Sequence, residues 1–178
     1  MLVLKNDRRR HRRLAHQQIP ADMPPMTDLV FDLKTEAETA AFGARLAPIL
    51  NAGDVVCFEG PLGAGKSTLA RGLIRAFCGA KDVPSPTFTL VETYEGASDA
   101  IWHFDLYRLD KQSEIWELGF EDAIETGISL IEWPDKIKDI LPDGALRLCF
   151  DVQSDGARRL TLIAPDQWMP ALRQAGIA

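Results

Sequence analysis

The sequence holds little cysteine, no long apolar segment and no broad excess of positive charge. Only three cysteines, Cys57, Cys78 and Cys149, occur among the 178 residues, and their wide spacing fits neither a zinc site nor a disulfide framework. No apolar run approaches the ~20 residues of a membrane-spanning helix. The overall charge of −6 argues against a broad nucleic-acid-binding surface. We therefore expect a reduced cytoplasmic protein that contacts neither DNA nor a membrane.

Positive charge gathers at the N-terminus. Residues 1–18 carry one lysine and five arginines against a single aspartate, a charge of +5 that leaves −11 for the rest. Residues 19–26 add three prolines without hydrophobic periodicity. We interpret residues 1–26 as a mobile basic arm and residues 27–178 as one domain. The arm is either a tail for RNA contact or targeting, or else a disordered extension or the product of an upstream start codon, with real translation beginning at Met23 or Met26. Basic runs are weak signals, which favours the second interpretation.

The stretch Gly60–Ser67 says most about chemistry, because it matches the pattern G-x-x-x-x-G-K-[ST] at every constrained position. An apolar run precedes it and a helical pattern follows, the order typical of a phosphate-binding loop. The loop amides and the helix N-terminus direct partial positive charge at a phosphate chain. We expect Lys66 to reach the β- and γ-phosphates of a nucleotide and Ser67 to bind Mg²⁺. The expected contact set is Gly60, Pro61, Leu62, Gly63, Ala64, Gly65, Lys66, Ser67 and Thr68.

Two acidic residues end apolar stretches further along the chain. Asp105 follows Ile101–Phe104, and Glu132 follows Ile128–Ile131. Ligands of open α/β sheets bind at the carboxyl ends of strands, and Mg²⁺ usually takes one or two carboxylates. We interpret Asp105 and Glu132 as metal ligands beside Ser67, with a cap of a helix or turn as the alternative for each acid.

Three further residues have two open interpretations each. Thr87 is either a sensor of the γ-phosphate or a threonine that starts a strand. Trp133 either stacks on a base or a partner, or packs in the core. His103 is expected to point to one face of the sheet in a structural rather than a catalytic role. Because Leu106 rather than a second acid follows Asp105, no general base is evident, and we expect slow unaided hydrolysis.

The alternation of apolar patterns predicts an α/β fold of three layers, similar to P-loop NTPases, with a mixed β-sheet flanked by helices. A capping box at Thr35–Glu38 begins a helix to about Leu50 that buries Ala40, Ala44, Ala47 and Leu50. Other helices are expected from the loop to Phe77, over 111–118 and over 166–175. Strands are expected over 28–33, 55–59, 88–94, 100–105, 128–131, 145–152 and 158–164, with a hairpin at 95–99.

Five motifs occur together, in order: Gly60–Ser67, Ser85–Val91, His103–Leu109, Leu118-Gly119 and Ile131–Pro134. In this combination the chain resembles the bacterial TsaE (YjeE) family over about residues 28–164. That family comprises small P-loop ATPases needed for the threonylcarbamoyl modification of adenosine 37 in tRNAs that decode ANN codons. Pro61 departs from the family, which often has aspartate there, and the basic arm is not part of the family pattern.

The resemblance implies ATP and Mg²⁺ as cofactors. It implies that Lys66 and the loop amides bind the phosphates and that Ser67 and Glu132 bind the metal. Asp105 would have the role of the strand-end acid. Thr87 becomes the switch threonine. Trp133 lies beside the nucleotide, Glu36 at its adenine end, and Arg158 at a further contact. The implied partners are two sugar-kinase-like subunits of a transferase complex, which the ATP cycle resets, so that tRNA is contacted indirectly.

Two other functions use the same loop. A small-molecule kinase is the main alternative, although no arginine-rich lid and no acceptor-binding segment are evident. A nucleotide-gated binding module with negligible turnover is the other, because it needs the same ATP site. The sequence does not separate this module from a slow ATPase.

Overall fold

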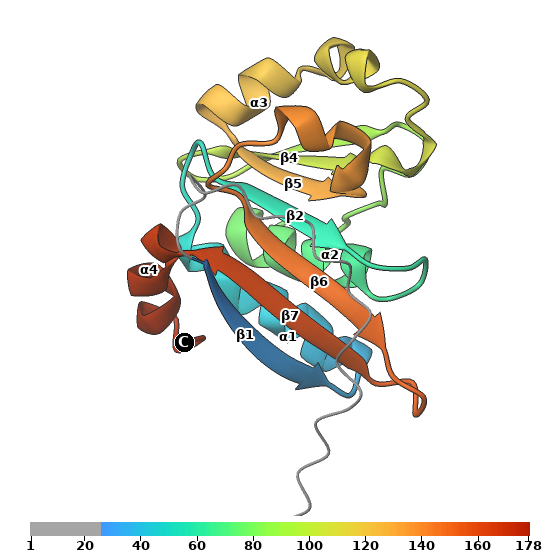
Figure 1. Ribbon diagram of the computed structural model, residues 1–178. Helices are drawn as coiled ribbons and strands as arrows, with labels where there is room; N and C mark the ends of the chain where they lie inside the picture. Colours follow the sequence, from blue (N-terminus) through green and yellow to red (C-terminus); the bar gives the residue numbers. More distant parts are fainter. Residues whose placement is uncertain (1–25) are drawn as a thin grey trace, which may run out of the picture.

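Residues 26–178 are described by a computed structural model, and they build one mixed sheet with helices on both faces (Figure 1). The basic arm predicted over 1–26 lies outside the described residues except for Met26, which opens the first strand. The elements are β1 (Met26–Leu33), α1 (Glu36–Leu46), β2 (Val55–Glu59), α2 (Lys66–Cys78), β3 (Val91–Glu95), β4 (Ala100–Asp105), α3 (Phe120–Thr126), β5 (Ile128–Glu132), β6 (Leu146–Val152), β7 (Arg158–Pro165) and α4 (Met169–Gln174).

The sheet of residues 26–178 has seven strands in the order β1-β7-β6-β2-β5-β4-β3. Its four central strands, β6, β2, β5 and β4, run parallel to one another. The outer strands β7 and β1 on one side, and β3 on the other, pair antiparallel. The expected hairpin is the β3–β4 pair. This arrangement confirms the mixed sheet, and it gathers the carboxyl ends of the parallel strands at one edge.

Helices cover the two faces of the sheet unequally. On one face α1 and α2 pack side by side, with Phe42, Leu46, Leu69 and Leu73 in the larger core. On the other face, α3 and nearby 3₁₀ turns cover β4 and β5 with a smaller core that includes Phe120. Figure 1 shows α3 above β4 and β5, on the side opposite α2. None of the helices within residues 26–178 has the length and apolar character of a membrane span.

The first helix is correctly predicted at its start but not along its buried side. The Glu38 amide donates to Thr35 Oγ1 over 3.0 Å, and the Glu38 carboxylate accepts at 2.7 Å from the amide of Lys34, the residue before the N-cap. The helix ends at Leu46, and a 3₁₀ turn, Ala47–Ile49, follows. Its buried residues are Thr39, Phe42, Gly43 and Leu46, whereas Ala40 and Ala44 are half-buried. The expected burial of Ala47 and Leu50 is confirmed.

Other differences from the expected elements lie where short turns replace regular structure. The strand expected over 88–94 begins only at Val91, because Leu90 turns the chain with a φ of 64° and its amide donates to the Pro86 carbonyl. The helix expected over 111–118 is a 3₁₀ segment, and α3 follows it after Gly119. The closing helix divides into a 3₁₀ turn and α4. A 3₁₀ segment over Pro134–Ile140 was not predicted.

The cysteine at the middle of β2 takes the place of a small apolar side chain. Cys57 is buried in the sheet as a free thiol. Burial is the main cause that raises the pKa of the Cys57 thiol to about 12. A thiol with so high a pKa is a poor nucleophile at neutral pH, because the thiolate is the reactive species.

Gly43 in α1 and Gly72 in α2 allow the two helices to approach closely, and Gly72 provides a test of this packing. A Cβ added at Gly72 would overlap the backbone carbonyl of Ala40. In an unconstrained helix, glycine to alanine stabilises by ~1 kcal/mol. Here we expect Gly72→Ala to lower the free energy of unfolding instead, by about 1–3 kcal/mol through overpacking.

Urea unfolding of Gly72→Ala measures this effect, and the exposed Ala76 on the same helix supplies the matched control. Ala76→Gly reports the propensity cost of glycine in α2 without a packing contact. A Gly72→Ala variant that is more stable than the natural chain would show that α1 and α2 have room to separate.

Candidate functional site

The loop between β2 and α2 has the backbone shape that its glycines allow. Gly60, Gly63 and Gly65 have φ angles of 129°, 76° and 112°, a region that residues with side chains rarely adopt. At Gly60 an added Cβ would also meet the backbone of Phe150. Gly65 caps α2, and no side chain bonds to the first amides of the helix. The loop therefore leaves the helix N-terminus open toward the space above it.

A pocket of about 280 Å³ lies above this loop. Three loop residues of the predicted contact set, Gly60, Pro61 and Ala64, do not line it; Ala64 is buried in the core. The pocket wall also includes Arg71 and Tyr107, which sequence reasoning missed. Arg71 lies one helical turn after Ser67, a spacing that puts it near the same face. The predicted residues that line the pocket are Glu36, Leu62, Gly63, Gly65, Lys66, Ser67, Thr68, Thr87, Asp105, Glu132, Trp133 and Arg158.

The two strand-end acids lie next to each other at the edge of the sheet. Asp105 and Glu132 are directly paired in the parallel register of β4 and β5. Side chains alternate along a strand, so both acids lie on the α2 face, as do Ile101 and Leu130 in the core beneath. Asp105 is 4% exposed and Glu132 is 2% exposed. Such buried carboxylates need hydrogen-bond donors, and the structure supplies several.

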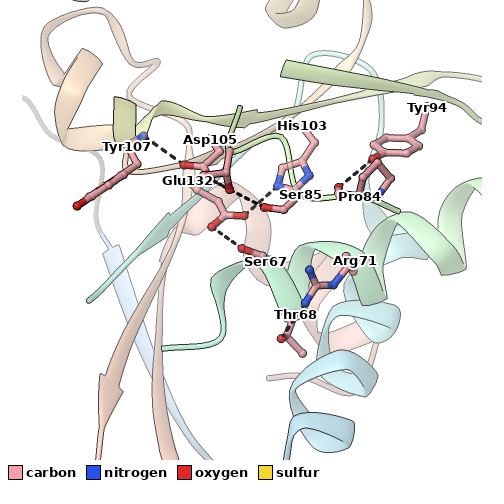
Figure 2. A network of polar contacts seen from close by, with 11 residues as sticks. Ser67, Thr68, Arg71, Pro84, Ser85, Tyr94, His103, Asp105, Tyr107 and Glu132 are labelled. Atoms are coloured by element: carbon pink, nitrogen blue, oxygen red, sulfur yellow. Dashed lines mark hydrogen bonds and ion pairs between the residues drawn. The ribbon is translucent and has the colours of Figure 1, made fainter. Parts of the chain in front are cut away.

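Glu132 uses its two oxygens toward different elements. The hydroxyl of Ser67 in α2 donates to Glu132 Oε2 over 2.9 Å, and His103 Nε2 in β4 lies 3.0 Å from Glu132 Oε1 (Figure 2). The hydrogen bond between Ser67 and Glu132 joins two residues that the sequence assigned to one metal. His103, expected to have a structural role on one face of the sheet, contacts the Glu132 member of that pair.

Asp105 connects the pocket to the turn before β3. Thr87 Oγ1 donates to Asp105 Oδ2 over 2.8 Å, and the Ser85 hydroxyl lies 2.9 Å from Thr87 Oγ1. Asp105 Oδ1 accepts from the Tyr107 amide at 3.2 Å, which caps the 3₁₀ turn that follows β4 (Figure 2). Asp105 thus lines the pocket and also caps a turn, the role that the sequence offered as its alternative. Thr87 lies in a turn, so the interpretation as a strand-starting residue is wrong.

Lys66 is held within its own loop. Its ammonium group donates to the carbonyls of Gly60 and Pro61, at 2.9 Å each, and lies 3.9 Å from the centre of the Trp133 ring. Burial lowers the pKa of Lys66, and the nearby charges of Glu132 and Asp105 oppose this effect. Trp133 reaches this position in a left-handed conformation with a φ of 61°. Such strain in a bulky residue is typical of functional sites.

Glu36 and Arg158 approach the pocket from outside the loop. Thr68 Oγ1 donates to a carboxylate oxygen of Glu36 over 3.4 Å, which links α1 to the first turn of α2. The Arg158 guanidinium approaches Gly65 from β7. Both side chains therefore stand at the wall of the pocket formed by the helix N-terminus and the neighbouring strands.

The polar groups of the pocket suit a hard cation. Among residues 26–178, no group of three or more histidine, cysteine, aspartate or glutamate side chains is arranged to hold a metal ion. Ser67, Asp105 and Glu132 instead offer one hydroxyl and two carboxylates. Mg²⁺ prefers such an oxygen-only set, because it keeps several waters and takes its other ligands from substrate phosphates. The donor set therefore fits Mg²⁺ better than a metal that is enclosed by protein ligands.

The bond between Ser67 and Glu132 predicts a stability difference. In Ser67→Ala the buried carboxylate loses one of its two donors. A hydrogen bond to a charged group is worth about 1.5–3 kcal/mol when buried, and the half-buried position of Ser67 reduces this. We expect a loss of about 1 kcal/mol in the free energy of unfolding. Ser67→Thr keeps the hydroxyl and should lose much less; equal losses in urea unfolding would contradict the assigned bond.

Comparisons with known proteins agree with the fold and the motifs. The family model described as threonylcarbamoyl adenosine biosynthesis protein TsaE matches residues 33–160. The TsaE protein of Rickettsia felis is 39% identical over 74% of this chain and 77% of its own length. The TsaE protein of Haemophilus influenzae is 39% identical over 78% of this chain and 91% of its own length. The crystal structure of Bacillus subtilis YdiB superposes with a TM-score of 0.70 at 25% identity, covering 85% of this chain and 96% of YdiB. The chain therefore belongs to the TsaE family.

Proposed function

We propose that this protein binds ATP with Mg²⁺, hydrolyses it slowly, and serves tRNA threonylcarbamoyladenosine biosynthesis as an accessory factor. The observation that carries the proposal is the pocket in which the Gly60–Ser67 loop faces two adjacent strand-end carboxylates. The names of the relatives support the pathway, and family membership supports a P-loop nucleotide site.

In this proposal the residues of the pocket divide the work of binding. The loop amides and Lys66 hold the phosphates, and Lys66 leaves its loop carbonyls to do so. Ser67 and Glu132 hold Mg²⁺, with Asp105 beside them. The metal supplies charge neutralisation at the phosphates. Trp133 covers Lys66 and limits water around it, Glu36 contacts the adenine end, and Arg158 adds a further positive charge.

Slow hydrolysis by the protein alone follows from the acids that line the pocket. These are Glu36, Asp105 and Glu132, and each already accepts a hydrogen bond from a neighbouring side chain. Leu106, directly after Asp105, is fully buried. In this proposal Asp105 and Glu132 serve the metal and Glu36 the adenine end, so none of them is left as a general base for an attacking water.

The segment before β3 is the part through which a partner would sense the nucleotide. Thr87 is bound to Asp105, Leu90 holds a left-handed turn, and Phe88 between them is 81% exposed. Such a short turn can change conformation when a hydroxyl gains or loses a phosphate contact. We propose that the partners are the two sugar-kinase-like subunits of the transferase complex, that tRNA is contacted indirectly, and that the setting is cytoplasmic.

Replacement of Lys66 tests the ATP site. Lys66→Ala removes the only lysine among residues 26–178 that lines the pocket, and we expect it to abolish measurable ATP binding in calorimetry. Lys81, an exposed lysine outside the pocket, is the matched control, and Lys81→Ala should bind ATP as the natural chain does. Tight ATP binding by Lys66→Ala would disprove the assigned loop.

ATP turnover by the protein alone and with the two transferase subunits tests the wider proposal. We expect turnover well below the ~10 s⁻¹ of typical enzymes for the protein alone, and a sharp rise with the subunits present. Fast turnover by the protein alone would contradict the absence of a general base. Unchanged turnover without complex formation would detach the protein from this pathway, and phosphoryl transfer to a metabolite would favour the kinase alternative.

A further inference from the structure

His103 stands in the core of the protein with one polar contact. It is fully buried in β4, and its Nε2 lies 3.0 Å from Glu132 Oε1. Its other ring nitrogen, Nδ1, is buried without a hydrogen-bond partner among residues 26–178. Buried polar atoms are nearly always paired, and an unpaired nitrogen costs stability. An apolar side chain would suit this place in the sheet better, so core packing alone does not account for the histidine.

The contact to Glu132 defines the direction of the hydrogen bond from the imidazole. Glu132 Oε2 accepts the Ser67 hydroxyl, and the carboxylate has only acceptor atoms to offer. The ring must therefore donate from Nε2 to this carboxylate. Within residues 26–178, the one hydrogen bond of the His103 side chain is thus directed at one oxygen of Glu132.

This arrangement gives the two oxygens of Glu132 different tasks. Oε1 is turned toward the core and occupied by His103, whereas Oε2 is turned toward Ser67 and the pocket (Figure 2). Because the imidazole ring is rigid and buried, its hydrogen bond restrains rotation of the carboxylate. Ligands held in this way by an outer hydrogen bond bind metals more tightly.

We propose that His103 is a positioning residue, which holds Glu132 so that Oε2 and the Ser67 hydroxyl meet the same Mg²⁺. The inference rests on the proposed function, because it assigns His103 to the metal of that site. His103 does not touch the nucleotide, since it does not line the pocket. Its effect must therefore be seen in the response to Mg²⁺ and not in metal-free nucleotide binding.

Three substitutions separate the hydrogen bond from packing. His103→Leu replaces the imidazole with an apolar side chain of similar size and so removes the donor. His103→Gln carries an amide donor at about the reach of Nε2, the atom that contacts Glu132. His103→Asn carries the same amide at the reach of Nδ1, which makes no contact. The glutamine and asparagine variants are thus matched in chemistry and differ in the position of the donor.

Calorimetric titration of each variant with ATP, in EDTA and over a series of free Mg²⁺ concentrations, tests the proposal. For His103→Leu we expect the Mg²⁺ concentration at half-maximal enhancement to rise ~10–100-fold, the usual cost of losing such an outer contact. ATP affinity in EDTA should stay unchanged. His103→Gln should restore the Mg²⁺ response, and His103→Asn should not.

Several results would overturn the inference. An unchanged Mg²⁺ midpoint in His103→Leu would do so, as would equal loss of ATP affinity with and without Mg²⁺, which indicates a structural defect. If His103→Leu does not fold, identical Mg²⁺ midpoints for the glutamine and asparagine variants overturn it instead. A natural chain that binds no ATP would reject the proposed function together with this inference, whereas the other outcomes reject only the role of His103.

Discussion

Two carboxylates side by side in the interior are the constraint on which the rest of the site depends. The register of β4 and β5 makes Asp105 and Glu132 direct neighbours, and both are almost wholly buried. Like charges at this separation repel, and their burial removes the water that would screen them. The protein therefore surrounds them with donors and with one cation: Ser67, His103, Thr87, the Tyr107 amide and the ammonium group of Lys66.

This constraint connects parts of the chain that are distant in sequence. Ser67 connects Glu132 to the helix after the loop, and Thr87 connects Asp105 to the turn before β3. A cation and phosphates in the pocket would compete for the same oxygen atoms and hydroxyls. The segment at Thr87, where Leu90 holds a left-handed turn, would then respond to a change at Asp105. In the proposed function the site and its switch are coupled because they share these two acids.

The sequence predicts the site better than its surroundings, for reasons that lie in particular residues. Asp105 and Glu132 follow apolar runs, so their place at strand ends can be read from the pattern. The same alternation puts His103 on the face of Asp105, but the partner of its imidazole depends on the register between strands, which the sequence does not contain. The buried side of α1 was misjudged because Gly43 and Gly72 let two helix backbones touch. Leu90 shortens β3 through a local conformation that leucine rarely adopts.

In the proposed function, the loop after β2 and the paired acids of β4 and β5 form one site for Mg²⁺ and nucleotide. A crystal structure with Mg²⁺ and a non-hydrolysable ATP analogue tests it most directly. We expect the triphosphate on the amides of Gly63–Ser67, the ammonium group of Lys66 moved from its carbonyls to the phosphates, and Mg²⁺ bound by Ser67 on the side of Glu132. A nucleotide bound elsewhere, or a metal ion that touches neither Ser67 nor the two acids, would contradict it.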